Sequence, residues 1–121
     1  MSHSYLSLDD LLDLASSMGV PHVRDLGLLE SARVRPQIQI FGTESYPTMA
    51  QKAAALLESI VRNHPLLDGN KRLGWTSATV FLAMNGHQVE VDDDVAVDFV
   101  TNIAAGQVSF EEMVSWFEAR I

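Results

Sequence analysis

The nine residues 64–72, HPLLDGNKR, combine the side-chain types that the transfer of a phosphoryl or nucleotidyl group requires. They supply an imidazole, a carboxylate, a glycine, an amide and two adjacent cations: His64, Asp68, Gly69, Asn70, Lys71 and Arg72. The apolar-periodic segment LGWTSATVFLAM follows, so Gly69 and Asn70 are expected at the start of a helix, where backbone N–H groups are unpaired. The stretch therefore predicts an anion-binding site.

Each residue type in this stretch has a role if the anion is a nucleoside triphosphate. Phosphate oxygens would lie against the amides of Gly69 to Lys71, because glycine permits close approach of the backbone. Asp68 would hold a Mg²⁺ ion that bridges phosphates, and Lys71 and Arg72 would stabilise the charge that develops during transfer. His64 is suited to accept the proton of an attacking protein hydroxyl.

The same residues also have structural interpretations. His64 is suited to the end of a helix, Asp68 and Asn70 are common in turns and N-caps, and Lys71 and Arg72 are compatible with a solvated surface. Any of these interpretations explains a single residue. The occurrence of all five within nine positions favours the chemical interpretation.

A metal site built on the histidines is not indicated by their spacing. His64 and Asp68 are four residues apart and would point the same way on a helix, but Pro65 and Gly69 oppose a helix there. The other histidines have no ligand spacing and are expected as surface or capping residues: His3, His22 and His87. The two tryptophans, Trp75 and Trp116, are expected in the core.

Composition limits the class of protein. A chain of 121 residues with 47% hydrophobic and 20% charged residues is expected to fold as a single domain, 1–121. The absence of cysteine excludes disulfides and thiolate metal sites. A net charge of −8 opposes binding to nucleic acid. No apolar run is long enough for a membrane span and the start lacks a basic segment, so a cytoplasmic protein is expected.

Apolar periodicity and capping residues predict an all-α bundle of about six short helices that positions the 64–72 stretch. The expected helices are 7–18, 22–33, 48–63, 71–85, 92–106 and 109–117. Ser7 with Asp10 and Ser109 with Glu112 resemble capping boxes, and Thr48 is a candidate N-cap. The 71–85 helix is apolar on nearly all sides, which predicts that it lies at the centre of the bundle.

One segment departs from the helical pattern. QIQIF, residues 37–41, alternates polar and apolar side chains before Gly42, which predicts a short exposed strand or hairpin. An exposed edge strand can bind an extended peptide by adding a strand. An ordinary surface loop is the alternative.

The 64–72 stretch resembles the HxFxD(A/G)NKR loop of the Doc (death-on-curing) toxins of the Fic/Doc superfamily, with Leu66 in place of the usual Phe. Four other segments resemble the family: RDLGLLESARVRPQ (24–37), TMAQKAAALLESIVRNHP (48–65), FLAMNG (81–86) and AAGQVSFEEM (104–113). The resemblance covers nearly the whole chain. It implies a Fic/Doc-like bundle in which the hairpin forms a flap where target segments dock.

Two positions separate the reactions known in this superfamily. Enzymes that transfer AMP have a glycine where this chain has Lys71, and a second arginine where it has Trp75. The lysine of the Doc branch implies a reversed nucleotide that presents its γ-phosphate. The resemblance thus implies a toxin that uses ATP and Mg²⁺ to phosphorylate a Ser or Thr hydroxyl of a host protein such as elongation factor Tu, which blocks translation.

The resemblance also implies how the protein is controlled. The inhibitory motif of the superfamily, Ser or Thr followed four residues later by Glu and then Gly or Asn, is absent from the sequence. Inhibition is therefore expected from a cognate antitoxin of a toxin-antitoxin module. A Fic-type AMP transferase and a catalytically silent binding module are the alternatives.

Overall fold

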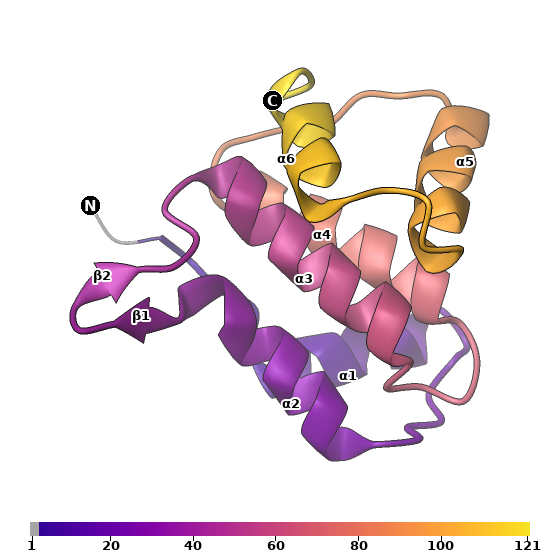
Figure 1. The fold of residues 1–121 in the computed structure, drawn as a ribbon. Helices are drawn as coiled ribbons and strands as arrows, with labels where there is room; N and C mark the ends of the chain where they lie inside the picture. Colours follow the sequence, from indigo (N-terminus) through magenta and orange to yellow (C-terminus); the bar gives the residue numbers. More distant parts are fainter. Residues whose placement is uncertain (1–2) are drawn as a thin grey trace.

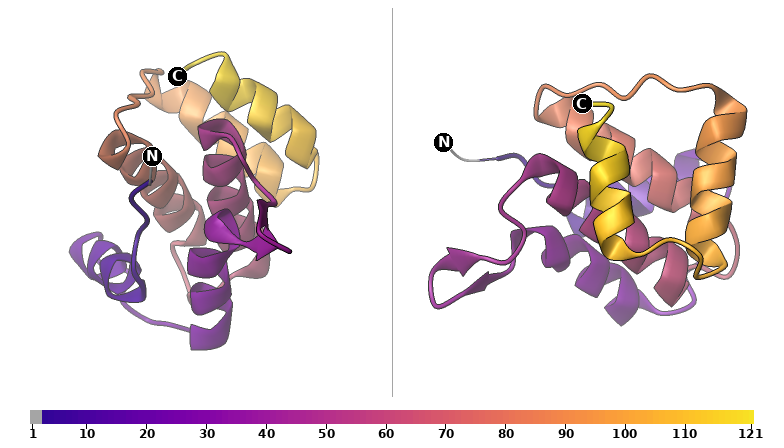
Figure 2. Two further views of the ribbon diagram at one scale, coloured as in Figure 1. Left: turned by 90° about the vertical axis from the view of Figure 1, so that its left-hand side faces the viewer. Right: turned by 45° about the horizontal axis from the view of Figure 1, so that its top comes forward.

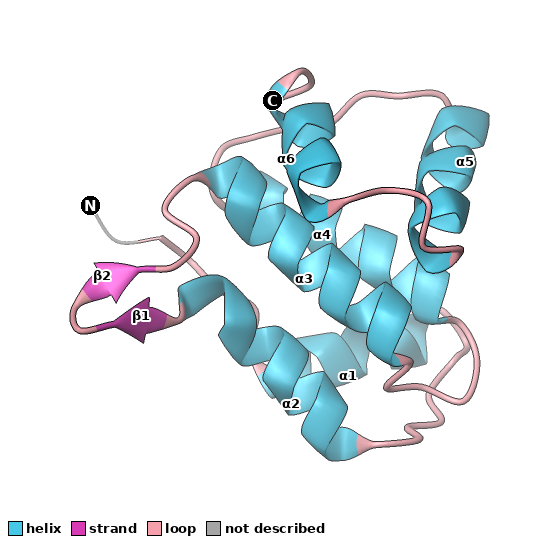
Figure 3. Ribbon diagram, viewed as in Figure 1, coloured by secondary structure: helices cyan, strands magenta, loops and turns pink. Residues whose placement is uncertain are grey.

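Six α-helices and one small antiparallel hairpin make up the described part of this computed structural model, residues 3–121 (Figures 1 and 3). The helices are α1 (Leu8–Ser17), α2 (Leu26–Val34), α3 (Met49–Asn63), α4 (Asn70–Met84), α5 (Asp93–Ala104) and α6 (Phe110–Glu118). A short 3₁₀ turn, η1 (Arg35–Gln37), precedes strands β1 (Gln39–Ile40) and β2 (Thr43–Glu44). This confirms the predicted all-α bundle with a hairpin. Within residues 3–121, no helix has both the length and the apolar character needed to cross a membrane.

Side-chain caps fix where three of the helices begin. Ser7 and Asp10 form a reciprocal capping box at α1, and Ser109 and Glu112 form another at α6. Thr48 caps α3, where Gln51 completes a third box. Each box satisfies backbone N–H groups that a helix start leaves unpaired, so the sequence defines these boundaries locally.

The predicted position of the 71–85 helix at the centre of the bundle is wrong. Helix α3 has ten buried residues of its 15, whereas α4 has seven of 15. Figure 1 shows α3 crossing the middle of the molecule, where it contacts α2, α4, α5 and α6. The consecutive alanines 53–55 are all buried, and their small side chains let neighbouring helices approach on more than one side.

The second helix begins later than the sequence predicts. Asp25 has extended backbone angles and its carboxylate accepts a hydrogen bond from Leu28 N (3.0 Å), so α2 starts at Leu26 rather than near His22. Residues 22–25 are left outside the helix. They pair instead with the loop that follows α3, as described below.

The hairpin extends away from the helices, on the left in Figure 1 and toward the viewer in the left panel of Figure 2. Its two-residue turn consists of Phe41 and Gly42, both with positive φ (50° and 80°). The Phe41 side chain is fully exposed. The observed strand β1 is shorter than the predicted strand, residues 37–41, because Gln37 belongs to η1.

A buried lysine fixes the hairpin to α3. Lys52 is 0% exposed, and its Nζ donates a hydrogen bond to Glu44 Oε1 of β2 (2.9 Å) and another to the carbonyl oxygen of Tyr46. A buried ammonium group without a partner is costly. Displacement of the hairpin would therefore remove the partner on which Lys52 depends.

This ion pair leads to a prediction about pH. The hydrogen bond and the charge of Lys52 lower the pKa of Glu44 below its usual 4.5. A carboxyl group whose pKa is lower in the folded chain adds stability above its unfolded pKa, and this contribution is lost as the pH falls through the folded pKa. In denaturant titrations from about pH 6 down to pH 3, the free energy of unfolding should decrease less for Glu44→Gln than for the wild type.

The control for the pH series is Glu118→Gln, which removes an exposed carboxylate of α6. This variant should follow the wild-type curve. Equal pH dependence of the wild type and Glu44→Gln would show that the pair does not contribute.

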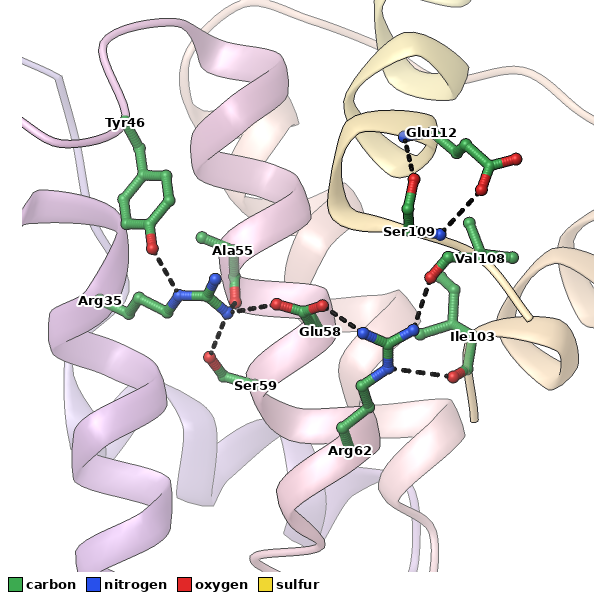
Figure 4. A network of polar contacts seen from close by, with 10 residues as sticks. All are labelled: Arg35, Tyr46, Ala55, Glu58, Ser59, Arg62, Ile103, Val108, Ser109 and Glu112. Atoms are coloured by element: carbon green, nitrogen blue, oxygen red, sulfur yellow. Dashed lines mark hydrogen bonds and ion pairs between the residues drawn. The ribbon is translucent and has the colours of Figure 1, made fainter. Parts of the chain in front are cut away.

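A second polar network joins α3 to both of its flanks (Figure 4). Glu58 accepts hydrogen bonds from Arg35 (2.8 Å) and from Arg62. Arg35 also donates to the Tyr46 hydroxyl (2.9 Å). Arg62 donates to the carbonyl oxygens of Ile103, in α5, and Val108, in the loop before α6. Because one carboxylate serves two guanidinium groups, α3 holds the hairpin base and the α5–α6 segment in one network.

Candidate active site

His64 lies directly at the end of α3 and has left-handed backbone angles, φ 53° and ψ 60°. This conformation is uncommon for a residue other than glycine. It turns the chain out of the helix, and the following Pro65 prevents continuation. His64 is exposed, whereas Pro65 is buried.

Arg24 stabilises this helix end. Its Nε donates to the His64 carbonyl oxygen (2.7 Å), and its Nη2 donates to the Asn63 carbonyl oxygen (2.9 Å). The backbone N–H groups of Arg24 and Asp25 both donate to the carbonyl oxygen of Pro65, at 2.8 and 3.0 Å. These carbonyl groups have no partner within α3, and a cation at a helix C-terminus is also favourable.

The loop pairs with the segment before α2 in the manner of a short strand. Leu67 N donates to the His22 carbonyl oxygen (2.9 Å), and Val23 and Leu66 form an antiparallel bridge. Leu66 is 1% exposed and belongs to the hydrophobic core. A leucine at this position therefore still anchors the loop, although the related motif has Phe there.

Asn70 closes the loop from inside. Its Oδ1 accepts a hydrogen bond from Leu66 N (2.8 Å), and its Nδ2 donates to the Leu66 carbonyl oxygen (3.0 Å). The side chain is buried. The side-chain amide of Asn70 is thus engaged within the loop, and its backbone N–H group belongs to the first turn of α4.

Gly69 is the N-cap of α4, with φ 85°, and no side chain caps this helix start. A Cβ atom at Gly69 would lie 2.6 Å from Val20 Cγ1, so the loop also packs closely against the segment after α1. The first amides of α4 therefore begin beside a glycine that has no side chain to cover them. This geometry fits the amide-based anion site predicted from the sequence.

The cationic side chains of the loop differ in their contacts. Four of the eight lysines and arginines form ion pairs with carboxylates: Arg33, Arg35, Lys52 and Arg62. Of the four without an ion pair, three donate to backbone carbonyl oxygens: Arg24, Arg72 and Arg120. Within residues 3–121, Lys71 is the cation with neither kind of partner, and it is exposed in a chain of net charge −8.

Arg72 is held by α1. Its Nη2 donates to the Met18 carbonyl oxygen (2.6 Å), at the C-cap of that helix. One N–H group of the guanidinium is therefore occupied. The guanidinium retains further N–H groups that can bind an anion.

A pocket of about 460 Å³ lies between α4 and α5, and Lys71, Arg72 and Trp75 form its α4 wall. Its lining does not include His64 or Asp68. Asp68 is exposed on the loop, and residues 3–121 contain no group of three or more His, Cys, Asp or Glu residues placed to hold a metal ion. A single carboxylate fits Mg²⁺ bound mainly through phosphates and water rather than a metal site made by protein alone.

Comparison with models of protein families shows which family the chain belongs to. The model of the Fic/DOC family matches residues 5–82, which include α1, α2, α3, the whole 64–72 loop and most of α4. The chain belongs to the Fic/Doc family.

Two curated relatives extend the Fic/Doc assignment beyond the residues that the family model matches. A protein named Toxin Doc, from Mycolicibacterium smegmatis, is 42% identical over 115 residues, which cover 92% of this chain and 88% of that protein. A protein named Protein kinase doc, from Escherichia phage P1, is 32% identical over 91 residues, covering 75% of this chain and 71% of that protein. The likeness to the first relative thus covers most of the chain.

Sequence analysis of this Fic/Doc chain missed the residues that support the loop. Arg24, Val20 and the Met18 carbonyl group contact it from positions 40 to 54 residues earlier in the chain. Nothing in their own spacing marks them, because an arginine before a helix and a carbonyl at a helix end are common features. The one signal in the sequence is Asp25, a residue type that favours the N-cap position. An N-cap there places residues 22–24 outside α2, where they are free to pair with another segment.

Proposed function

We propose that this Fic/Doc chain is a Doc-type protein kinase that transfers the γ-phosphate of ATP to a Ser or Thr hydroxyl of a host protein, with elongation factor Tu as the expected target. The observation that carries the proposal is the 64–72 loop, where the exposed His64 follows the end of α3 and Lys71, which has no ion-pair partner within residues 3–121, lies in the first turn of α4. The name of the phage relative, Protein kinase doc, supports it.

The residues have distinct tasks in the proposed reaction. His64 accepts the proton of the target hydroxyl while the hydroxyl oxygen forms a bond to the γ-phosphorus and the bond to the β-phosphate oxygen breaks. The backbone amides at the start of α4 and the side chains of Lys71 and Arg72 hold the phosphate oxygens. Asp68 would hold Mg²⁺, which supplies charge neutralisation at the phosphates.

Lys71 also favours γ-phosphate transfer over AMP transfer. Its side chain occupies the position that is a glycine in the AMP-transferring enzymes, and Trp75 lies where those enzymes have a second arginine. The indole of Trp75 packs against Trp116 (5.8 Å between ring centroids) and cannot bind phosphate as a guanidinium does. AMP transfer is the competing reaction, and the assay must distinguish it from transfer of the γ-phosphate.

A cognate antitoxin is proposed as the regulator, since the chain lacks the inhibitory motif of the superfamily. The proposed location is the cytoplasm, where ATP and the translation factor are present. The product, a phosphorylated translation factor, would stop protein synthesis.

The test of the kinase proposal is a paired labelling assay in a bacterial translation extract. Purified protein is incubated with ATP labelled at either the γ- or the α-phosphate. Label from the γ-position on a protein of the extract supports the kinase, whereas label from the α-position identifies an AMP transferase. Absence of transfer from both labels would indicate a binding module.

Arg24 provides a prediction about positioning. Arg24→Gln removes the two side-chain hydrogen bonds to the α3 carbonyl groups, and the His64 backbone should then leave its left-handed conformation. We expect kcat to fall by about 10- to 100-fold, because small displacements of a catalytic group have large effects. KM for ATP should stay nearly unchanged, since Arg24 does not line the α4 end of the site.

The matched control is Arg33→Gln, which makes the same charge change on α2, where Arg33 pairs with Glu30. It should retain the wild-type kcat. The three-bond H^N–Hα coupling of His64, measured by NMR together with its backbone chemical shifts, depends on its φ angle. A variant with lower kcat but unchanged coupling would contradict the positioning role of Arg24.

A further inference from the structure

We propose that residues 18–25, the α1–α2 connector, position the 63–72 loop along its whole length. The first turn of the connector, Met18 to Val20, places Arg72 and Gly69 for phosphate binding. The inference rests on the proposed kinase function and adds positioning groups that lie outside the loop itself. Arg24, at the other end of the connector, serves His64.

The α1–α2 connector lies beside the loop that joins α3 to α4 (Figure 1). The two segments run antiparallel, since residues 22 and 23 pair with residues 66 and 67 as a short antiparallel strand. The contacts on either side continue in the same order: Met18 with Arg72, Val20 with Gly69, and Arg24 with His64 and Asn63. Each end of the connector therefore contacts a different end of the loop.

The first turn of the connector ends α1 with a Schellman motif. Gly19 has a φ of 75°, and its N–H group donates to the Ser16 carbonyl oxygen (3.0 Å). Val20 N donates to the Ala15 carbonyl oxygen (2.9 Å), which completes the motif. Glycine adopts a positive φ at little cost, whereas a residue with a Cβ atom is strained there. Gly19 therefore determines the path by which the chain leaves α1.

The carbonyl group of Met18 belongs to this turn and accepts the hydrogen bond from Arg72 Nη2 (2.6 Å). Rotation about the φ angle of Gly19 turns the planar peptide group that contains this carbonyl oxygen. A change at Gly19 therefore moves the acceptor relative to Arg72. Without the acceptor, the long side chain of Arg72 has more conformational freedom to lose when a phosphate binds.

Val20 contacts the start of α4 directly. A Cβ atom at Gly69 would lie 2.6 to 2.9 Å from three carbon atoms of the buried Val20 side chain. Gly69 is the N-cap of α4, so the first amides of this helix follow it immediately. The turn thus contacts two of the groups that hold phosphates in the proposed reaction, the helix start and the guanidinium of Arg72.

The turn after α5 provides a matched control. Gly106 also has a φ of 75°, and its turn contains the same two backbone hydrogen bonds, at 2.9 and 3.0 Å. A Cβ atom at Gly19 or at Gly106 would meet no atom beyond the neighbouring residues within 4 Å. Alanine at either position therefore strains the backbone without a clash. The turn at Gly19 contacts the loop, whereas the turn at Gly106 leads into α6.

The experiment measures the binding of inorganic tripolyphosphate, in the presence of Mg²⁺, to Gly19→Ala and Gly106→Ala by calorimetry. Gly19→Ala should raise the Kd about 10-fold, because a hydrogen bond that involves a charged group contributes on that order. Gly106→Ala should bind like the wild type. Both variants should lower the Tm by similar amounts, so that lower stability alone does not explain the weaker binding.

The labelling assay separates the two ends of the connector. Gly19→Ala should raise the KM for ATP by the same factor as the Kd for tripolyphosphate. Arg24→Gln should lower kcat and leave the KM for ATP nearly unchanged. A loss of kcat alone in Gly19→Ala would contradict the assignment of the turn to the phosphates.

A second variant tests the turn if Gly19→Ala does not fold. Val20→Ala removes the two methyl groups beside Gly69, and Val108→Ala removes the same groups from the loop before α6. In NMR spectra, Val20→Ala should shift the amide signals of residues 69–72, whereas Val108→Ala should not. The Kd for tripolyphosphate should rise for Val20→Ala alone.

Three outcomes would overturn the inference. Wild-type tripolyphosphate binding by folded Gly19→Ala or Val20→Ala, in a protein whose wild type transfers γ-label, rejects the role of the turn and leaves the kinase proposal intact. Equal losses of binding in Gly19→Ala and Gly106→Ala attribute the effect to stability and reject positioning. A wild type that neither binds tripolyphosphate nor transfers label rejects both proposals.

Discussion

Replacing His64 with alanine should lower the rate of γ-phosphate transfer by about two to four orders of magnitude, because general base catalysis contributes about 10² to 10⁴. The fold should persist, since the side chain is exposed and the loop is held by Leu66 and Asn70. Label incorporation in the translation extract measures transfer, and thermal unfolding measures stability.

Two companion variants separate the chemistry of His64 from its backbone conformation. His64→Asn keeps a residue that tolerates the left-handed region and should be as inactive as His64→Ala. His22→Ala removes an exposed imidazole from the neighbouring segment and should transfer at the wild-type rate. A folded His64→Asn with wild-type transfer would exclude the histidine as the base.

Replacing Lys71 with methionine should reduce γ-phosphate transfer by about 10²- to 10³-fold, the typical effect of removing one group that stabilises the charge of a transition state. Stability should change little, because Lys71 is exposed and has no partner within the described chain, residues 3–121. Single-turnover assays with γ-labelled ATP measure the loss.

The control for Lys71 is Arg33→Met, which changes the net charge by the same amount on the distant helix α2. If transfer depended only on total charge, both variants would lose activity equally. A Lys71→Met protein that retains full γ-transfer would remove the cation from the mechanism, while transfer of α-label by this variant would show that Lys71 decides the reaction.

The sequence alone determined the helices and the position of the loop between them. The two predicted capping boxes at α1 and α6, the predicted N-cap Thr48 at α3 and the breaker Pro65 act through neighbours within about four residues. Such local interactions can be read from spacing. The loop motif was visible for the same reason, because its chemically active residues lie within nine consecutive positions.

Only the tertiary structure decided what supports the loop and which helix lies at the centre. Arg24 reaches the end of α3 across about 40 residues, Val20 packs on Gly69, and Lys52 depends on a carboxylate in the hairpin. Helix α3 is central because its small alanine side chains allow other helices to pack closely against it. Which helices pack there is decided by the tertiary structure. Contacts between distant segments are set by the packing of the whole chain, so no pattern within a single segment can specify them.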